Sequence, residues 1–406
     1  MRTRLTLALA MLAAAGVAAQ DSGAGFSVPI TLGGGAMYTD RLQAEGDASP
    51  YTAGFRAVLY PTLRLDDHWF GYAAIQLREA PYFYYDAFDS SHDFYTEVIQ
   101  AFVGYSARRG KNALVIKAGR LASAVGAFPM RYDDTDNPLL DQPLSYTTAL
   151  PVRGDQVPWG VYSLAGSLYG ANAYAAAANA PGLTPVTLYS IPGIEADVSL
   201  GGRVDGRVQI TSGSPANPQS ITQFAHASQW AAGAGYTIRQ GFRVGMSAFR
   251  GPYLGDNAAA SLPMGTGIRS FPSTGIGVDA QWASGRWSLN GEWQRFQFDS
   301  PGFAQQPSLQ SGYAEAKSIV TPRIYLAARA GWLATGSVAD SSGATATEFA
   351  PALASLEAGG GYWLGRNELI KASYEWLHIE GSPGARANVL GAQFVYRFNS
   401  LGWSFR

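Results

Sequence analysis

The chain has 406 residues, of which 48 are glycine, 13 % are aromatic and only 15 % are charged, and its formal net charge is −1. Without an excess of Lys and Arg it has no sign of a nucleic-acid partner, and the lack of cysteine excludes disulfides and thiol chemistry. If the chain is exported, this composition fits a secreted β protein or a membrane barrel.

The first residues predict export. Arg2 and Arg4 precede the apolar run 5–17, and small side chains follow up to Ala19. This is the pattern of a signal peptide, and the run is shorter than the roughly 20 residues that a membrane-spanning helix needs. We predict a signal peptide over residues 1–19, a mature chain over residues 20–406 and no transmembrane helix.

The mature chain alternates repeatedly between apolar and polar residues. In the stretch 323–332, for example, Ile324, Leu326 and Trp332 fall on one face, while Arg323 and Arg329 fall on the other. Alternation with a period of two indicates β-strands. The clearest further examples are residues 51–65, 203–210, 368–378 and 390–398.

The connections between these strands alternate in length. Short turns are predicted near residues 66–68, 108–111, 201–202, 239–241, 284–285, 321–322 and 365–367. Longer loops rich in Gly, Ser, Pro and Asp fall near residues 39–50, 80–93, 121–158, 213–226, 251–272, 299–310, 335–352 and 380–386. Tight periplasmic turns and long external loops are the signature of an outer-membrane barrel.

A soluble β-sandwich or propeller is the alternative, and three features argue against it. The strands reach the length that crosses a bilayer at a tilt. Charges lie in mid-strand, where a packed sandwich core would hold them only at a high desolvation cost. Aromatic residues gather toward strand ends, as interfacial girdles require: Trp69, Trp230, Tyr236, Trp282, Trp287, Trp332, Tyr362 and Trp376.

We therefore predict an all-β fold, a transmembrane antiparallel up-and-down β-barrel of about 16–18 strands with short periplasmic turns and long external loops. The uncertainty in number comes from residues 160–200, where 161–168, 172–178 and 187–200 could form three strands or one. Barrels of this size leave an aqueous channel.

If the apolar face meets lipid, the other face lines the lumen. Early and final strands carry basic residues there, which predicts a basic wall formed by Arg56, Arg64, Arg78, Lys117, Arg120, Lys371 and Arg397. The far side is mixed in charge, with Glu195, Asp197, Asp205, Asp279, Glu292, Glu315 and Glu357 beside Arg203, Arg207, Arg243, Lys317, Arg323 and Arg329.

The stretch 121–159 lacks a regular period but holds five prolines and many apolar residues. A loop this long is commonly functional, and its apolar content indicates that it packs against something. We predict that residues 121–158 fold inward as a constriction loop whose acids oppose Arg56, Arg78 and Lys117 across the channel. These acids are Asp133, Asp134, Asp136 and Asp141. The alternative is an external lid with solvated acids.

Other chemistry finds little support. The acidic run 133–137 has oxygen ligands suited to calcium but lacks the glycine and distal glutamate of an EF-hand, so we predict neither a metal nor a cofactor. The four histidines are scattered, and no G-x-S-x-G motif occurs. We predict that the chain is not an enzyme, although a hydrolase site assembled across strands would leave no sequence motif.

In its signal peptide, alternating strands, turn and loop rhythm and aromatic-rich strand 394–398, the chain resembles Gram-negative outer-membrane porins. It is most similar to the 16–18-stranded kind, which includes the phosphate-selective porin-like group. Such barrels usually end on an aromatic residue, whereas here Arg406 follows Phe405. The resemblance covers nearly the whole mature chain and rests on pattern, not on a sharp motif.

The resemblance implies an outer-membrane porin that passes small hydrophilic solutes or ions, with anions favoured by the basic wall. It also implies contact with outer-membrane lipid and lipopolysaccharide, and a possible homotrimer. The alternative from another class is a non-conducting barrel that acts as an adhesin or structural anchor. Stepwise conductance in a bilayer separates the two.

Overall fold

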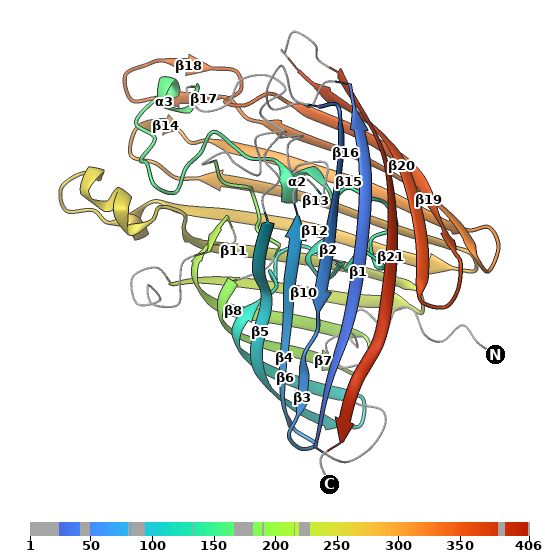
Figure 1. The fold of residues 1–406 in the computed structure, drawn as a ribbon. Helices are drawn as coiled ribbons and strands as arrows, with labels where there is room; N and C mark the ends of the chain where they lie inside the picture. The colour runs from blue at the N-terminus through green and yellow to red at the C-terminus, as the bar shows by residue number, and fades with distance from the viewer. Residues whose placement is uncertain are drawn as a thin grey trace.

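The computed structural model describes residues 24–40, 49–79, 82, 94–131, 133–165, 182–188, 191–214, 216–218, 228–380 and 386–404. Sixteen antiparallel strands form a closed barrel (Figure 1). The wall strands are β1 (Gly25–Thr39), β2 (Tyr51–Leu59, continued by β3, Thr62–Arg64), β4 (Trp69–Glu79), β5 (Phe94–Arg109), β6 (Asn112–Leu121), β7 (Ile191–Leu200), β8 (Val204–Ser214), β10 (Ser228–Arg239), β11 (Phe242–Pro252), β12 (Pro272–Ser284), β13 (Trp287–Phe298), β15 (Ser308–Ile319), β16 (Ile324–Thr335), β19 (Leu353–Trp363), β20 (Glu368–Ile379) and β21 (Arg386–Ser404).

The first and last strands close the barrel. β1 pairs antiparallel with β21 from Gly25↔Ser404 to Thr39↔Val389, with one irregularity after Val28. The last strand thus continues past Phe398, the residue at which the alternating pattern ends. Pro61 interrupts the second strand, because proline has no N–H for the ladder, and β1 pairs with both of its parts.

The strand count is settled by residues 160–200. Among the described residues of this region only β7 joins the wall, and it pairs directly with β6, so the lower of the predicted numbers is correct. Of the two alternatives for residues 161–168, a strand or part of a loop, the described part supports the loop, because Val161–Ala165 form the short helix α3. Ser163 explains the local choice, since its hydroxyl donates to the Gly160 carbonyl at 2.7 Å and offers the backbone a turn. The predicted strand at 172–178 lies outside the described residues.

The short and long connections fall where the sequence predicts them. Each predicted short turn joins two consecutive wall strands at one end of the barrel. Two of these turns need glycine, because Gly110 and Gly285 have φ of 61° and 58°, in the left-handed region. The opposite end carries the longer connections and is, by the barrel rule, the extracellular end.

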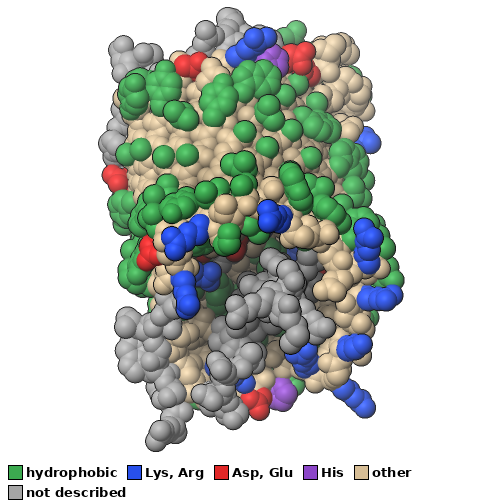
Figure 2. All heavy atoms as spheres, turned by 90° about the vertical axis from the view of Figure 1, so that its right-hand side faces the viewer, with side chains coloured by type: hydrophobic (Ala, Val, Ile, Leu, Met, Phe, Trp, Pro, Cys, Tyr) green, Lys and Arg blue, Asp and Glu red, His purple; other side chains and the backbone are tan. Residues whose placement is uncertain are grey.

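Alternation along each strand separates lipid from lumen. On β16, Leu326 is 57 % exposed on the outer surface, while Arg329 is 3 % exposed and points inward. Most of the predicted girdle aromatics are exposed on the outside: Trp69, Trp230, Tyr236, Trp287, Trp332 and Tyr362. Figure 2 shows hydrophobic side chains over the outer wall, with Lys and Arg side chains around a hollow below it.

The remaining elements are short. They are β9 (Asn217–Pro218), β14 (Phe303–Gln305), β17 (Val338–Asp340), β18 (Thr345–Ala346), η2 (Phe128–Arg131), α2 (Leu144–Thr147), α3, η5 (Asp256–Ser261) and η6 (Ile268–Ser270). Strands β14, β17 and β18 form a small separate sheet in the extracellular loops. Among the described residues, no helix is long and apolar enough to span a membrane.

Candidate functional site

The segment 121–159 lies inside the barrel, against inward-facing side chains on several sides. Near its start, the Ala124 N–H donates to Gln209 of β8 at 3.1 Å, and the Gly126 N–H donates to Ser247 of β11 at 3.0 Å. Its short helix α2 packs against β15 and β16 (Figure 1). Further on, the segment reaches Arg56 of β2. Its contacts therefore run from β8 around much of the wall.

Gly126 permits the tightest of these approaches. Its φ is 79°, and a Cβ at this position would collide with the side-chain oxygens of Glu292 and Tyr146. Both oxygens belong to one buried network, in which the Tyr146 hydroxyl donates to Glu292 at 2.9 Å. A glycine here lets the segment turn directly over β13.

The acidic run at residues 133–137 forms a tight turn. The N–H groups of Asp136 and Asn137 donate to the Asp133 carbonyl oxygen at 3.0 and 3.1 Å. The Asp133 carboxylate accepts from the Thr135 N–H at 2.8 Å. Aspartate favours such turns because its side chain bonds the backbone two residues on. The sequence thus places three carboxylates on one turn inside the lumen.

Two of these carboxylates are bound by the wall of β1 to β3. Arg56, 1 % exposed, pairs with Asp134 at 3.0 Å. Asp133 accepts a hydrogen bond from Thr31 at 3.0 Å and another from the Tyr60 hydroxyl, which precedes β3. Burial pushes the pKa of Asp133 upward, but the hydrogen bonds that it accepts, led by that from Tyr60, hold it below its usual range.

Lys371 holds the same turn from β20. Its Nζ donates to the carbonyl oxygens of Asp134, Asn137 and Leu139 at 2.8, 3.2 and 3.2 Å. An ammonium has three donors, and here all three are used. Lys371 is buried, so its charge stabilises the backbone of the turn and does not face channel water.

Arg329 of β16 is a second anchor, which the sequence placed on the mixed far side. Its guanidinium donates to the Asp141 carbonyl at 2.7 Å, to the Asn137 side chain at 2.8 Å and to Glu315 at 2.7 Å. Glu315 also pairs with Arg131 of the segment at 2.5 Å. A side chain from the segment thus completes an ion-pair network of the wall.

Asp141 and Asp136 have different surroundings. Asp141 is buried, and its backbone N–H donates to Glu357 at 3.2 Å, so its carboxyl lies near wall acids as well as near Arg329. The side chain of Asp136 is exposed. Partial loss of hydration inside the barrel and the negative charge of Asp133 raise the pKa of Asp136 to about 6, although the positive charge of Arg397 acts to lower it.

Other predicted basic residues have other partners. Lys117 of β6 pairs with Glu195 and Asp197 of the neighbouring β7 at 2.7 and 2.6 Å. Arg64 pairs with Asp67 at 2.9 Å beside a periplasmic turn. Lys117 therefore neutralises acids of the wall, and Arg64 neutralises an acid of a turn.

Arg78 and Arg120 lie near Glu97 of β5. The guanidinium of Arg78 sits 5.4 Å from the centre of the Tyr95 ring. Arg120, at the end of β6, is exposed. Of the basic residues expected to oppose the acids, Arg56 forms an ion pair with Asp134 of the segment, whereas Lys117 pairs with acids of the wall.

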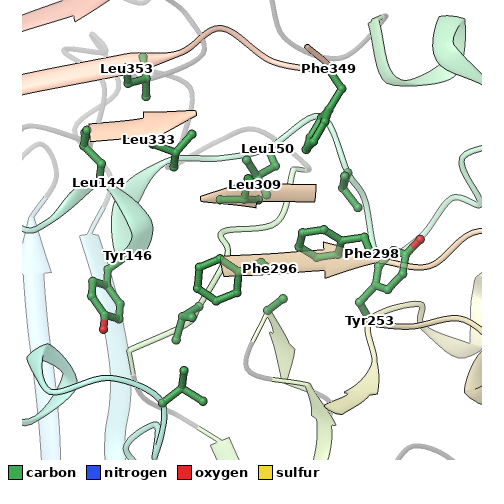
Figure 3. Close-up of a cluster of buried hydrophobic side chains, with 14 of the residues drawn as sticks. Leu144, Tyr146, Leu150, Tyr253, Phe296, Phe298, Leu309, Leu333, Phe349 and Leu353 are labelled. Carbon is green, nitrogen blue, oxygen red and sulfur yellow. The ribbon is translucent and has the colours of Figure 1, made fainter. Parts of the chain in front are cut away.

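The extracellular half of the lumen is apolar. Inward-facing Phe296 and Phe298 of β13 pack with Leu144 and Leu150 of the segment in one buried cluster (Figure 3). Alternation alone assigns the whole inner face to water, so the apolar character of this half is not predicted from the sequence. The signal was a switch along β13, where the inward residues change from Glu292 to Phe296 and Phe298.

Solved structures of outer-membrane proteins have the same architecture. DcaP of Acinetobacter baumannii, described as an outer membrane channel, matches with a TM-score of 0.55 and 10 % identity over 93 % of this chain and 99 % of its own. The fold is that of the outer-membrane β-barrels. The anion-selective porin from Comamonas acidovorans gives 0.53 and 11 %, over 93 % and 100 %.

A trimer form of OmpT from Vibrio cholerae is also similar, with a TM-score of 0.52 and 11 % identity over 93 % of this chain and 100 % of that one. The sequence matches no protein-family model and no curated protein. At such low identity, these structures establish the barrel fold, and the activity is argued from the residues.

Proposed function

We propose that this chain is an outer-membrane porin, which lets small hydrophilic solutes or ions diffuse passively through a water-filled channel. In this proposal the inward segment 121–158 sets the constriction. Its acids oppose basic side chains of the wall, with Arg56 and Lys371 holding the turn and Asp136 and Arg397 left to face water.

The pairing of the acidic turn with the wall of β1, β2 and β20 carries the proposal. A segment held by buried charge pairs keeps a fixed cross-section, as a selective channel requires. The fold neighbours support it as well, because two of them are described as a channel and as an anion-selective porin. A preference for anions or phosphate is the finer part of the proposal and rests on the basic residues alone.

Planar bilayer recording of the full chain tests the proposal. We expect stepwise openings, and a reversal potential in a salt gradient that reads the net charge of the lumen. The variant Asp133→Asn/Asp134→Asn should alter conductance and ion preference, because Arg56 and Lys371 lose their counter-charge. Asp66→Asn/Asp67→Asn, in an exposed periplasmic turn, removes the same number of charges and is the matched control. A folded barrel that stays silent in the bilayer would reject a porin.

The apolar cluster favours a second candidate, a non-conducting barrel that serves as an adhesin or structural anchor. Leu144 and Leu150 pack against Phe296 in the extracellular half of the lumen, and such packing could close it. The same recordings separate the two functions. We propose no catalytic role for the chain.

The proposal includes location and assembly. The predicted signal peptide and the outer-membrane fold support the outer membrane of a Gram-negative bacterium, with lipid and lipopolysaccharide around the barrel. The trimer form of one fold neighbour supports a homotrimer. Light scattering of the detergent-solubilised chain would give the number of copies, and a monomer would contradict this part.

A further inference from the structure

Six of the seven short turns at the periplasmic end carry exposed Arg or Lys side chains, and the exception is the turn between β3 and β4. These basic residues, here called the periplasmic ring, are Arg108, Arg109, Lys111, Arg203, Arg239, Arg286, Arg323 and Arg366. Figure 2 shows Lys and Arg side chains around a hollow on the right-hand side of Figure 1, where the turns after β15 and β19 lie. Positive charge therefore surrounds the periplasmic end of the barrel.

Little in the turns neutralises this charge. The described acids there are Asp66, Asp67 and Glu368, and Asp67 already pairs with Arg64. No side chain of the periplasmic ring forms an ion pair with another described residue. The eight basic groups are therefore available to a partner outside the chain.

The two ends of the barrel differ in charge. Outside the segment 121–159, the described part of the extracellular loops holds one basic residue, Arg269, against six acids. These acids are Asp40, Asp256, Asp299, Asp340, Glu348 and Glu380. A negatively charged partner is thus attracted to the periplasmic end and not to the extracellular end.

The shape of the ring favours an extended partner over a folded protein. The tips of the turns are short and polar, as in 110–112, which is Gly-Lys-Asn, and in 365–367, which is Gly-Arg-Asn. An interface with a folded protein needs a core of packed apolar side chains, which such tips do not offer. The charges also stand on separate turns around an opening, so a partner that repeats its anionic groups along a chain can reach several of them.

The chemistry of the ring points to carboxylates. Guanidinium pairs with carboxylate through two parallel hydrogen bonds. One exposed pair of this kind contributes little, but several pairs to linked groups add up, because after the first contact the others form within one complex. Below the outer membrane lies a polymer of this kind, the cell-wall glycan, whose short stem peptides carry free carboxylates.

We propose that the periplasmic ring docks the barrel on the acidic stem peptides of the cell wall. Basic groups on several turns pair with separate carboxylates of the same network. The contact uses only the turns, so it does not depend on whether the barrel conducts.

Co-sedimentation of the folded full chain, in detergent, with purified cell-wall sacculi tests the proposal. The ring variant is Arg203→Gln/Arg239→Gln/Arg286→Gln/Arg323→Gln. We expect it to bind sacculi at least about tenfold more weakly than the wild type, because each of four exposed pairs contributes about twofold. Binding of the wild type should also fall as NaCl rises from about 0.05 to about 0.5 M, since salt screens exposed charges.

A matched control removes four exposed charges toward the extracellular end, in the variant Arg250→Gln/Arg269→Gln/Arg295→Gln/Arg386→Gln. It should bind sacculi as the wild type does. Replacing the same four ring arginines with Lys keeps the charge and should keep most of the binding. Equal binding by the wild type and the ring variant would overturn the ring as the docking surface, as would an equal loss in the extracellular control.

The ligand is tested with the wild-type chain alone. Sacculi whose carboxyl groups have been converted to neutral amides should bind at least about tenfold more weakly. Polyglutamate should release the chain from native sacculi, whereas soluble dihexanoyl phosphatidylglycerol at the same concentration of charge should release much less, because its charges are not linked. Unchanged binding to amidated sacculi would overturn the carboxylate partner, and equal release by the phospholipid would assign the ring to lipid headgroups instead.

Discussion

The same strands line both halves of the lumen, but their inward side chains differ between the two halves. Toward the periplasm, inward positions carry charges that pair between strands. Arg243 of β11, for example, pairs with Asp279 of the neighbouring β12 at 2.7 Å and with Asp205 of β8, two strands away, at 2.6 Å. Toward the extracellular end, the same alternation places Phe296 and Phe298 inward, and the segment 121–159 covers them. The segment therefore packs on an apolar inner face toward the extracellular end and on polar inward side chains, such as Arg329 and Lys371, below it.

The boundary between the halves is where the segment is held. Arg56, Arg329 and Lys371 lie at this level, are nearly completely buried, and all bond the segment. An apolar surface binds without direction, whereas these charges fix one position. We infer that the apolar half supplies most of the binding energy for the segment. The three buried cations Arg56, Arg329 and Lys371, here called the charged belt, fix its position.

The largest effect is expected from the belt. Arg329→Met should lower the free energy of unfolding by about 3–5 kcal/mol, because Glu315 and the Asp141 carbonyl lose a buried partner. Urea unfolding followed by tryptophan fluorescence measures this. Arg323→Met, on an exposed turn, is the control. A loss as small as that of the control would mean that the belt does not position the segment.

In the apolar half, Phe296→Ala should cost about 3 kcal/mol, because it opens a cavity between β13 and the segment. The same unfolding assay applies. Met264→Ala, fully exposed on an external loop, should change the free energy by less than about 0.5 kcal/mol. If Phe296→Ala also left stability unchanged, the two halves would not differ in packing as described.

A smaller effect concerns the charge that still meets water. Asp136, with a pKa of about 6, is mostly ionised at neutral pH and gains a proton as pH falls. Lowering the pH from about 7 to about 5 should therefore remove negative charge and raise the anion preference of the reversal potential. Asp136→Asn should have that preference throughout, with no shift over this window. Persistence of the shift in Asp136→Asn would assign it to another group.

The smallest effect is expected outside both halves. Arg64 pairs with Asp67 at a periplasmic turn, and Asp67 is largely exposed. Arg64→Gln should change stability by less than about 0.5 kcal/mol, as is usual for surface ion pairs, and should leave ion preference unaltered. A measurable change in selectivity would mean that Arg64 lines the channel as part of the basic wall, as the sequence predicted.

The barrel itself could be predicted because each strand carries its own evidence. In β16, five outward residues alternate with inward ones, and no distant contact is needed to recognise the pattern. The short turns are equally local. Residues 161–165 could not be assigned from the sequence because a brief apolar run is ambiguous between helix and strand until its partners are known.

The site could be predicted only in part. Proline content and acids marked the segment, and Arg56 was placed on its wall. Alternation, however, says which face a residue occupies and not what covers that face at a given height. The anchoring by Arg329, and the pairing of Lys117 with Glu195, depend on strand neighbours and register, which only the assembled barrel defines.

The seam between β1 and β21 has a consequence for the order of folding. The first strand of the wall pairs with the last, so the barrel cannot close until the end of the chain has been delivered to the membrane. The hydrogen bond from Lys371 to Asp134 spans 237 residues, and contacts this distant in sequence form late and slowly. Until then the acidic turn lacks Lys371 as a partner, and the unassembled protein needs protection from aggregation until the barrel closes.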